Sequence, residues 1–244
     1  MNLASLRDRF GAKTEIFQTP ECRMHVHIDE RERHIDYAIC HEVQIDDCYG
    51  VRKRAEAGFA PQVIVDIGAH IGTFTALAAK YFPQARIYSF EPLKQHYELL
   101  VKNSRSGRCT PNNLAVLGFY GSEQGRDIYP SNEFERAYRA RQLSNAVSAA
   151  QMLRKFKLQH IDWLKIDCEQ SEVNIFRELD SLDRLKDIDL ISGEWHFETA
   201  KTELRTIVGK THDVEIVDEG HWNYFEARRK PTIKPAIASG GERA

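Results

Sequence analysis

Short apolar runs alternate with segments of helical period through most of this chain. Val63–Ile67 is a β-branched run of strand length, suited to burial on both faces of a sheet, and residues 161–167 are predicted to form another core strand. The segment after the first run carries apolar side chains at the spacing of one helix face, namely Phe74, Leu77, Ala78 and Tyr81. Strands that alternate with helices predict a largely parallel sheet with right-handed crossovers.

Further elements are expected in the same alternation. Residues 86–90, 112–117 and 189–196 are predicted strands, with a turn at Pro111 before the second of them. Pro92 fits the first turn of a helix. The apolar face of that helix would consist of Leu93, Tyr97, Leu100 and Val101. Residues 146–157 have a helical pattern, whereas the polar, arginine-rich segment 118–142 predicts a loop or a helical insert.

The residues before Val63 do not follow this alternation. Residues 15–17, 24–28 and 34–39 look like short strands or hairpin pieces, with turns around Pro20 and Asp29. We therefore expect a small, β-rich N-terminal extension over residues 1–60, packed on a core domain of residues 61–230. Residues 231–244, with two prolines and a Ser-Gly-Gly sequence, predict a loose tail.

A glycine turn connects Val63–Ile67 to the helix after it. Gly68 and Gly72 bracket the turn, and Asp66 lies near the end of the strand. A strand, a glycine turn and a helix in this order bring backbone and a helix amino end close to a ligand. A turn without a ligand is the alternative, but a carboxylate in a buried strand needs polar partners, which a ligand can supply. The spacing of the glycines differs from the G-x-G-x-x-G pattern of dinucleotide-binding proteins.

Titratable side chains occur where several predicted core strands end. Because the carboxyl ends of parallel strands meet at one edge of an open α/β sheet, where ligands bind, we expect these side chains to converge. Lys165 and Asp167 alternate along one of these strands and carry opposite charges. A central strand does not bury such a charge pair for stability alone. The residues at the strand ends are Asp66, Glu91, Asp167, Glu194 and His196.

The composition argues against several other kinds of protein. A net charge of −2 argues against nucleic-acid binding through bulk charge. The sequence has no apolar run of about 18 residues, and its first residues carry charges where a signal peptide is apolar, so no membrane span or secretion is expected. Five cysteines, an odd number, without a C-x-x-C pair fit reduced thiols in the cytoplasm.

Cysteine and histidine residues before Val63 raise the question of a metal site. No pair of them repeats a usual ligand spacing, and the alternation of His25 and His27 fits one face of a strand equally well. We therefore favour a plain β extension and expect no metal. The residues considered are Cys22, His25, His27, His34, Cys40, His41 and Cys48.

Several motifs together resemble the FkbM type of class I S-adenosylmethionine (SAM) methyltransferases. The first is the glycine turn at 65–72, where His70 replaces the middle glycine of the common acidic-x-G-x-G-x-G pattern. The others are Phe-Glu-Pro at 90–92, Asn-Leu-Ala-Val at 113–116 and Leu-Lys-Ile-Asp-Cys-Glu at 164–169, followed by Glu172. The family usually continues the last motif with Gly-Ala-Glu, whereas this chain has Gln170-Ser171-Glu172.

The resemblance implies a fold, a cofactor and a reaction. The fold is a Rossmann-like, mostly parallel seven-stranded sheet with helices on both faces and an antiparallel last strand, in which 212–218 and 221–227 form the final hairpin. The cofactor is SAM, with S-adenosylhomocysteine as product, and the reaction is O-methylation of a hydroxyl on a small molecule, sugar or natural product. The expected cofactor-binding residues are Asp66, Gly68, Ala69, His70, Gly72, Glu91, Pro92, Asn113 and Asp167.

An oxygen acceptor must lose a proton when it is methylated. His196 is the preferred general base because imidazole titrates near neutral pH, and Glu194 is the next candidate. A structural role for His196 is an equal alternative. Asp167 is expected to meet the amino group of the methionine moiety or to help place the acceptor.

Two other functions stay open. The altered Gln170-Ser171 pair leaves open a catalytically silent module that binds SAM or a partner. NAD-dependent oxidoreductases share the strand–turn–helix start, but they are less favoured. The expected partner is a small-molecule acceptor, neither nucleic acid nor a membrane, and the pattern leaves a homo-oligomer open.

Overall fold

A seven-stranded sheet forms the centre of the molecule. The computed structural model describes residues 14–19, 21–104, 107–117, 145–168, 171–196, 198–219 and 222–231. The strand order is β10-β11-β9-β8-β3-β4-β5, and β11 runs antiparallel to both of its neighbours. In that order the strands span His212–Glu219, Trp222–Arg229, Ile188–Glu194, Ile161–Ile166, Val63–Ile67, Arg86–Phe90 and Cys109–Asn112. The predicted sheet, including its antiparallel last strand, is confirmed.

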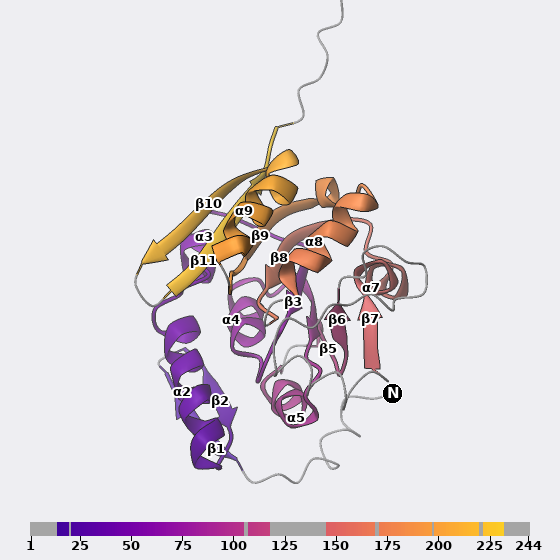
Figure 1. Ribbon diagram of the computed structural model, residues 1–244. Helices are drawn as coiled ribbons and strands as arrows, with labels where there is room; N and C mark the ends of the chain where they lie inside the picture. The colour runs from indigo at the N-terminus through magenta and orange to yellow at the C-terminus, as the bar shows by residue number, and fades with distance from the viewer. Residues whose placement is uncertain are drawn as a thin grey trace, which may run out of the picture.

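Helices cover both faces of this sheet (Figure 1). One face carries α2 (Glu30–Gln44), α3 (Val51–Glu56) and α4 (Thr73–Tyr81), and the other carries α7 (Ala149–Phe156), α8 (Glu172–Ser181) and α9 (Glu198–Ile207). Ile64 of β3 belongs to the core of the first face and Val65 to the core of the second. The central strand is buried on both sides, which explains why its sequence is an apolar run rather than an alternating one.

The helices after the first two parallel strands match the sequence pattern to different degrees. α4 buries Phe74, Leu77 and Ala78 as expected and ends before Pro83. α5 (Lys94–Asn103) begins two residues after Pro92, so the proline precedes the helix instead of opening it. The buried face of α5 is His96, Leu99, Leu100 and Asn103. Short 3₁₀ helices, η2 (Leu185–Asp187) and η3 (Val208–Lys210), lead into β9 and β10.

The N-terminal extension is more helical than the sequence predicted. The hairpin of β1 (Glu15–Gln18) and β2 (Arg23–Val26) lies where two short strands were expected. The predicted strand at 34–39 is wrong, because these residues lie inside α2. Asp29 caps this helix by accepting hydrogen bonds from the amides of Arg31 and Glu32. The buried face contains polar as well as apolar residues, which hid its helical period: Asp36, Cys40, Val43 and Gln44.

The predicted strand at 112–117 is confirmed only at its end, and that part does not belong to the main sheet. Pro111 lies inside β5 instead of in a turn; β5 is the edge strand, where a residue without an amide donor is tolerated. The chain then leaves the main sheet, and β6 (Ala115–Leu117) pairs in parallel with β7 (Ala146–Ser148). β7 also occupies the start of the predicted helix at 146–157.

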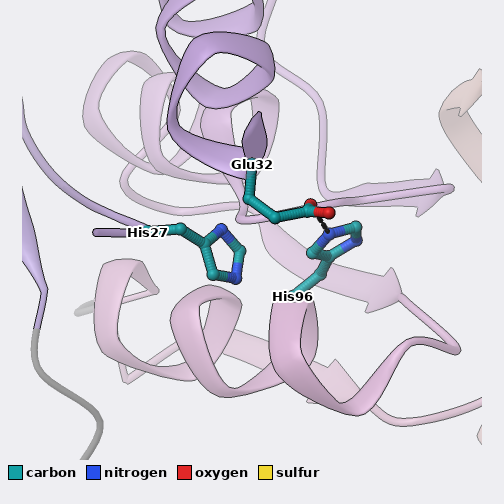
Figure 2. A group of neighbouring side chains, drawn as sticks. All are labelled: His27, Glu32 and His96. Atoms are coloured by element: carbon teal, nitrogen blue, oxygen red, sulfur yellow. Dashed lines mark hydrogen bonds and ion pairs between the residues drawn. The ribbon is translucent and has the colours of Figure 1, made fainter. Parts of the chain in front are cut away.

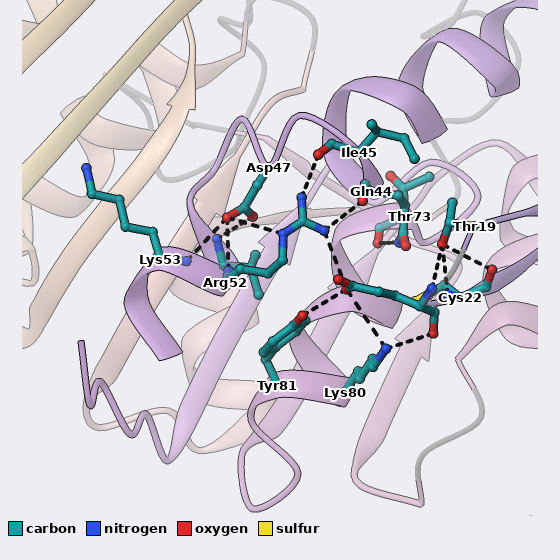
Figure 3. Close-up of polar contacts among 12 residues, drawn as sticks. Thr19, Cys22, Gln44, Ile45, Asp47, Arg52, Lys53, Thr73, Lys80 and Tyr81 are labelled. Atoms are coloured by element: carbon teal, nitrogen blue, oxygen red, sulfur yellow. Dashed lines mark hydrogen bonds and ion pairs between the residues drawn. The ribbon is translucent and has the colours of Figure 1, made fainter. Parts of the chain in front are cut away.

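Polar contacts fix the extension to the core (Figure 3). Gln44 Nε2 of α2 donates a hydrogen bond of 2.6 Å to the Thr73 carbonyl oxygen at the start of α4. Arg52 donates to the carbonyl oxygens of Gln44 and Ile45 at 2.8 and 2.6 Å, and its own amide donates to Asp47 at 3.0 Å. The end of α2 is therefore tied both to α3 and to the helix that follows the glycine turn.

Some predictions lie outside the described residues. They concern the segment 118–142, Glu169, Gln170, the turn of the last hairpin at Gly220 and the tail from residue 232 onwards. Among the helices that are described, none combines the length and the hydrophobicity needed to cross a membrane.

Candidate active site

The glycine turn lies between β3 and α4 and is held by the neighbouring strands. Gly68 has φ of +77°, and its amide donates a hydrogen bond of 3.0 Å to the Phe90 carbonyl oxygen at the end of β4. A Cβ at Gly68 would lie 1.6 Å from the Asp167 carbonyl oxygen, so the close approach of β8 requires glycine there. His70 has φ of +50°, which is uncommon for a residue with a side chain. The turn is thus a strained backbone segment supported from both sides.

Glu91 connects this turn to the end of β4. It is buried; its Oε2 accepts the His70 amide at 2.9 Å and its Oε1 accepts the Leu93 amide at 2.8 Å. Asn113 Nδ2 donates to the carbonyl oxygens of Glu91 and Pro92 at 3.0 and 2.9 Å, which fixes the strand end. Each carboxylate oxygen has two lone pairs, so Glu91 retains capacity to accept hydroxyl donors.

A buried charge pair joins β3 to β8. Lys165 Nζ lies 3.4 Å from Asp66 Oδ1 and 3.7 Å from Asp167 Oδ2, and it donates to the Gly68 carbonyl oxygen at 2.8 Å. Asp66 Oδ2 also accepts a hydrogen bond of 2.7 Å from Thr75 Oγ1. Burial by itself lowers the pKa of Lys165, but the facing carboxylates outweigh burial and raise the pKa above its ordinary value. Lys165 is therefore a fixed positive charge beneath the turn.

The three predicted catalytic residues meet at the ends of β8 and β9. His196 Nε2 lies 3.8 Å from Asp167 Oδ1 and 3.9 Å from Glu194 Oε2. On the other side of the ring, Nδ1 lies 3.3 Å from Oε1 of Glu172, the first residue of α8. The same Glu172 oxygen accepts the Cys168 amide at 2.8 Å, which holds it in place. His196 is thus surrounded by carboxylates from three parts of the chain.

This concentration of carboxyl groups changes their proton affinity. Burial raises the pKa of Glu194 to about 8, and the charges of Asp167 and Glu42 act in the same direction. Burial also raises the pKa of Glu42 to about 7, again with a contribution from Asp167. A carboxyl group with a pKa near neutrality can exchange protons under physiological conditions, as general acid–base chemistry requires.

Residues of the extension complete the cluster, and the sequence did not point to them. Tyr49 donates its hydroxyl to Asp167 Oδ2 at 3.3 Å, and its ring lies 5.5 Å from Lys165 Nζ. Glu42 on α2 interacts electrostatically with the same carboxylate. Neither residue belongs to a motif, and only the packing of the extension on the sheet brings them here. The contact of Glu172 with His196 could have been anticipated, because Glu172 begins the helix after Asp167.

The predicted site residues form two neighbouring groups. Lys165 links them, since it contacts Gly68 in one group and Asp66 and Asp167 in the other. The group around the turn and the end of β4 contains Gly68, Ala69, His70, Gly72, Glu91, Pro92 and Asn113. The second group contains Asp66, Asp167, Glu194 and His196. Their individual roles remain predictions.

The second group also contains side chains of the kinds that bind metal ions. Asp167, Glu194 and His196 each offer a ligand atom within 4.8 Å of the others. Lys165 already places a positive charge 3.7 Å from Asp167. The cluster therefore carries its own cation, which favours a proton-transfer site over a metal site.

The strand order and the glycine turn at the carboxyl edge define a class I methyltransferase fold. The family profile described as Methyltransferase FkbM domain matches residues 66–218, more than half of the chain. The chain belongs to this FkbM methyltransferase family. Family membership confirms the predicted class of enzyme and S-adenosylmethionine as its cofactor.

Named relatives were found among both sequences and structures. Methyltransferase sdnD of Sordaria araneosa is 26% identical over 177 residues, which cover 57% of this chain and 67% of the relative. Methyltransferase 1 of Beauveria bassiana is 24% identical over 197 residues, with 68% of this chain and 77% of the relative covered. Among solved structures, M. jannaschii TYW2 in complex with AdoMet has a TM-score of 0.47 and 14% identity, with 91% of this chain and 89% of that chain covered.

Proposed function

We propose that this SAM-dependent methyltransferase methylates a hydroxyl oxygen on a small molecule, a sugar or a natural product. The observation that carries the proposal is the cluster of Asp167, Glu194 and His196 beside the glycine turn. The cluster offers a proton acceptor, which an alcohol requires when it becomes an ether. The net charge of −2 supports a small-molecule acceptor over a nucleic acid.

The cofactor half fits SAM by the chemistry of its donor and acceptor groups. Glu91 has spare acceptor capacity at the end of β4, where we place the ribose hydroxyls. Gly68, His70 and Gly72 form the turn that would lie along the methionine part. When bound, SAM supplies a methyl group on a positively charged sulfur, and the chain has to hold the acceptor oxygen in line with it.

The acceptor half would remove the proton of the hydroxyl. We assign this step to His196, whose Nδ1 faces Glu172 while Nε2 faces Asp167 and Glu194. Glu172 would act as a positioning residue by fixing the orientation of the ring. Glu194, with its pKa raised to about 8 by burial, is the second candidate for the base.

A methyl-transfer assay with a panel of acceptors tests the proposal. Wild-type protein and SAM would be incubated with alcohols, phenols, sugars and amines, and S-adenosylhomocysteine formation would be measured. Turnover confined to hydroxyl acceptors is expected. Turnover of amines alone would overturn the O-methylation proposal.

A thermal-shift comparison separates the remaining alternatives. SAM and S-adenosylhomocysteine should raise the melting temperature and NAD should not, because a ligand stabilises the folded state that binds it. Stabilisation by SAM without turnover of any acceptor class would instead favour a catalytically silent module.

A further inference from the structure

A second cluster of ligand-type side chains lies on the other side of the glycine turn, between the extension and α5. Figure 2 shows His27, which follows β2, together with Glu32 of α2 and His96 of α5. Each of the three offers a nitrogen or carboxylate oxygen, and these atoms lie within 4.8 Å of one another. The three residues come from three separate parts of the chain, so the packing of the extension on α5 creates the cluster.

His27 is held in an orientation that presents one nitrogen to the cluster. Asp36 Oδ2 lies 2.8 Å from His27 Nδ1 and accepts the His27 amide at 2.7 Å. Asp36 is fully buried on α2, so this contact fixes both the ring and its tautomer. His27 Nε2 is buried and makes no hydrogen bond within the described part of the chain.

His96 has a corresponding arrangement. Its Nε2 lies 3.2 Å from Glu32 Oε2, and its Nδ1 lies 3.7 Å from Glu91 Oε1. Each histidine thus has a carboxylate at Nδ1, Asp36 for one and Glu91 for the other, and Nε2 remains for the cluster. A carboxylate behind the outer nitrogen is the usual support of a metal-ligating histidine.

We propose that His27, Glu32 and His96 bind a divalent transition metal ion such as Zn²⁺. Two imidazoles and one carboxylate are a common ligand set, and a fourth position would be left for water. At Zn–N and Zn–O distances of about 2.0–2.2 Å, tetrahedral ligand atoms lie about 3.4 Å apart. The His96–Glu32 separation of 3.2 Å already matches that spacing.

The proposed ion would connect the extension to the cofactor half. Glu32 lies on α2, His27 follows β2, and His96 faces the carboxylate of Glu91. The ring of His70 in the glycine turn packs against His96, with centroids 4.2 Å apart. The ion would therefore act as a structural link at the edge of the turn. This inference is independent of the acceptor chemistry proposed above.

Metal titration of the full chain tests the proposal. Protein stripped with a chelator would be titrated with Zn²⁺ in a calorimeter, and with Co²⁺ while the visible spectrum is recorded. We expect one ion per chain and cobalt absorption bands typical of a four-coordinate site. His27→Gln and Glu32→Gln should each weaken binding at least tenfold, and Asp36→Asn about 10–100-fold because it removes the support of His27.

His160→Gln is the matched control. His160, Asp162 and Asp189 form another potential ligand group, which lies at the start of β8. This variant should bind Zn²⁺ like the wild type. Circular dichroism would verify folding, and Glu32→Gln, a substitution at a partly exposed helix position, keeps the test valid if His27→Gln fails to fold. Unchanged binding in Glu32→Gln, loss of binding only in His160→Gln, or no Zn²⁺ binding by the wild type would overturn the proposal.

Discussion

At the scale of single residues, the electrostatics of the site depend on Lys165. Its ammonium group is buried and faces Asp66 and Asp167, while its hydrogen bond to Gly68 reaches the turn itself. Removing one member of such a pair leaves an uncompensated buried charge, at a cost of about 3–5 kcal/mol. The pair therefore keeps the ends of β3 and β8 in one arrangement, on which both halves of the site rely.

His196→Ala tests the assignment of the general base. Turnover should fall by about 10²–10⁴, the usual contribution of a positioned base, while the SAM dissociation constant stays nearly unchanged. Steady-state kinetics and calorimetry would measure the two quantities, with the partly exposed His160→Ala as a control. Full turnover in His196→Ala would direct the search to Glu194 and then Asp167.

Glu91→Ala tests the cofactor half. SAM binding should weaken at least tenfold, because a charge-assisted acceptor contributes about 1.5–3 kcal/mol. The variant also leaves the His70 and Leu93 amides without their acceptor, so Glu91→Gln, which retains one carbonyl oxygen, separates loss of charge from loss of support. Glu98→Ala on α5, the helix that follows Glu91, is the control. Wild-type SAM affinity in a folded Glu91→Ala protein would contradict the assignment.

At the scale of elements, patterns of apolar residues predicted the buried strands and α4 well but failed where polar residues pack inside. β3 was recognisable because burial on both faces leaves it one polar residue, Asp66, and β8 because four of its six residues are apolar. Residues 34–39 of α2 were predicted as a strand because the inner face of the helix there includes the polar Asp36, whose partner His27 follows β2. β5 was missed because Pro111, usually a sign of a turn, is acceptable inside an edge strand.

The glycine turn gives a prediction at this scale. Gly68→Ala should lower the free energy of unfolding by at least about 2 kcal/mol, because a positive φ costs roughly 1–2 kcal/mol for an L-residue and the new Cβ overlaps the Asp167 carbonyl. His70→Asn should change it by less than about 1 kcal/mol and largely preserve SAM binding, since asparagine tolerates a positive φ. Urea denaturation would measure both. A Gly68→Ala protein as stable as the wild type would contradict the described turn.

At the scale of the whole molecule, the site joins strand ends whose convergence was predictable with residues of the extension whose approach was not. The strand ends that bear Asp167, Glu194 and His196 could be predicted to converge, because parallel strands share one edge. The contributions of Tyr49 and Glu42 could not be predicted, since the positions of these residues depend on how the extension packs on the sheet. The same limit applies to the proposed metal site, where Glu32 and His96 are 64 residues apart.

The dependence of stability on pH is a prediction for the whole molecule. The pKa of Glu194 is about 8 and that of Glu42 about 7, both raised from 4.5 mainly by burial. The folded state keeps these protons after the unfolded state has released them. Their contribution to stability is therefore full below about pH 4.5 and is lost as the pH rises through about 7 and 8, by at most about 1.4 kcal/mol per pH unit for each group.

Chemical denaturation between about pH 5 and pH 9 would check this sign. Glu194→Gln and Glu42→Gln cannot lose a proton, so each should gain stability relative to the wild type as the pH rises. The exposed Glu15→Gln serves as a control and should follow the wild-type curve. If the free energies of unfolding of the wild type and Glu194→Gln changed in parallel with pH, the raised pKa of Glu194 would be contradicted.

The packing of the extension also determines which part of the chain can be exchanged between relatives. Val43, Tyr49 and Val51 share one buried cluster with Phe74 and Trp163 on the sheet side of α4. The match to the family begins at residue 66, inside β3, and so leaves those three residues out. A chimera joined at that position would combine halves of two cores that did not evolve to pack together. Recombination between relatives would have to take α2 and α3 together with the sheet as one inherited unit.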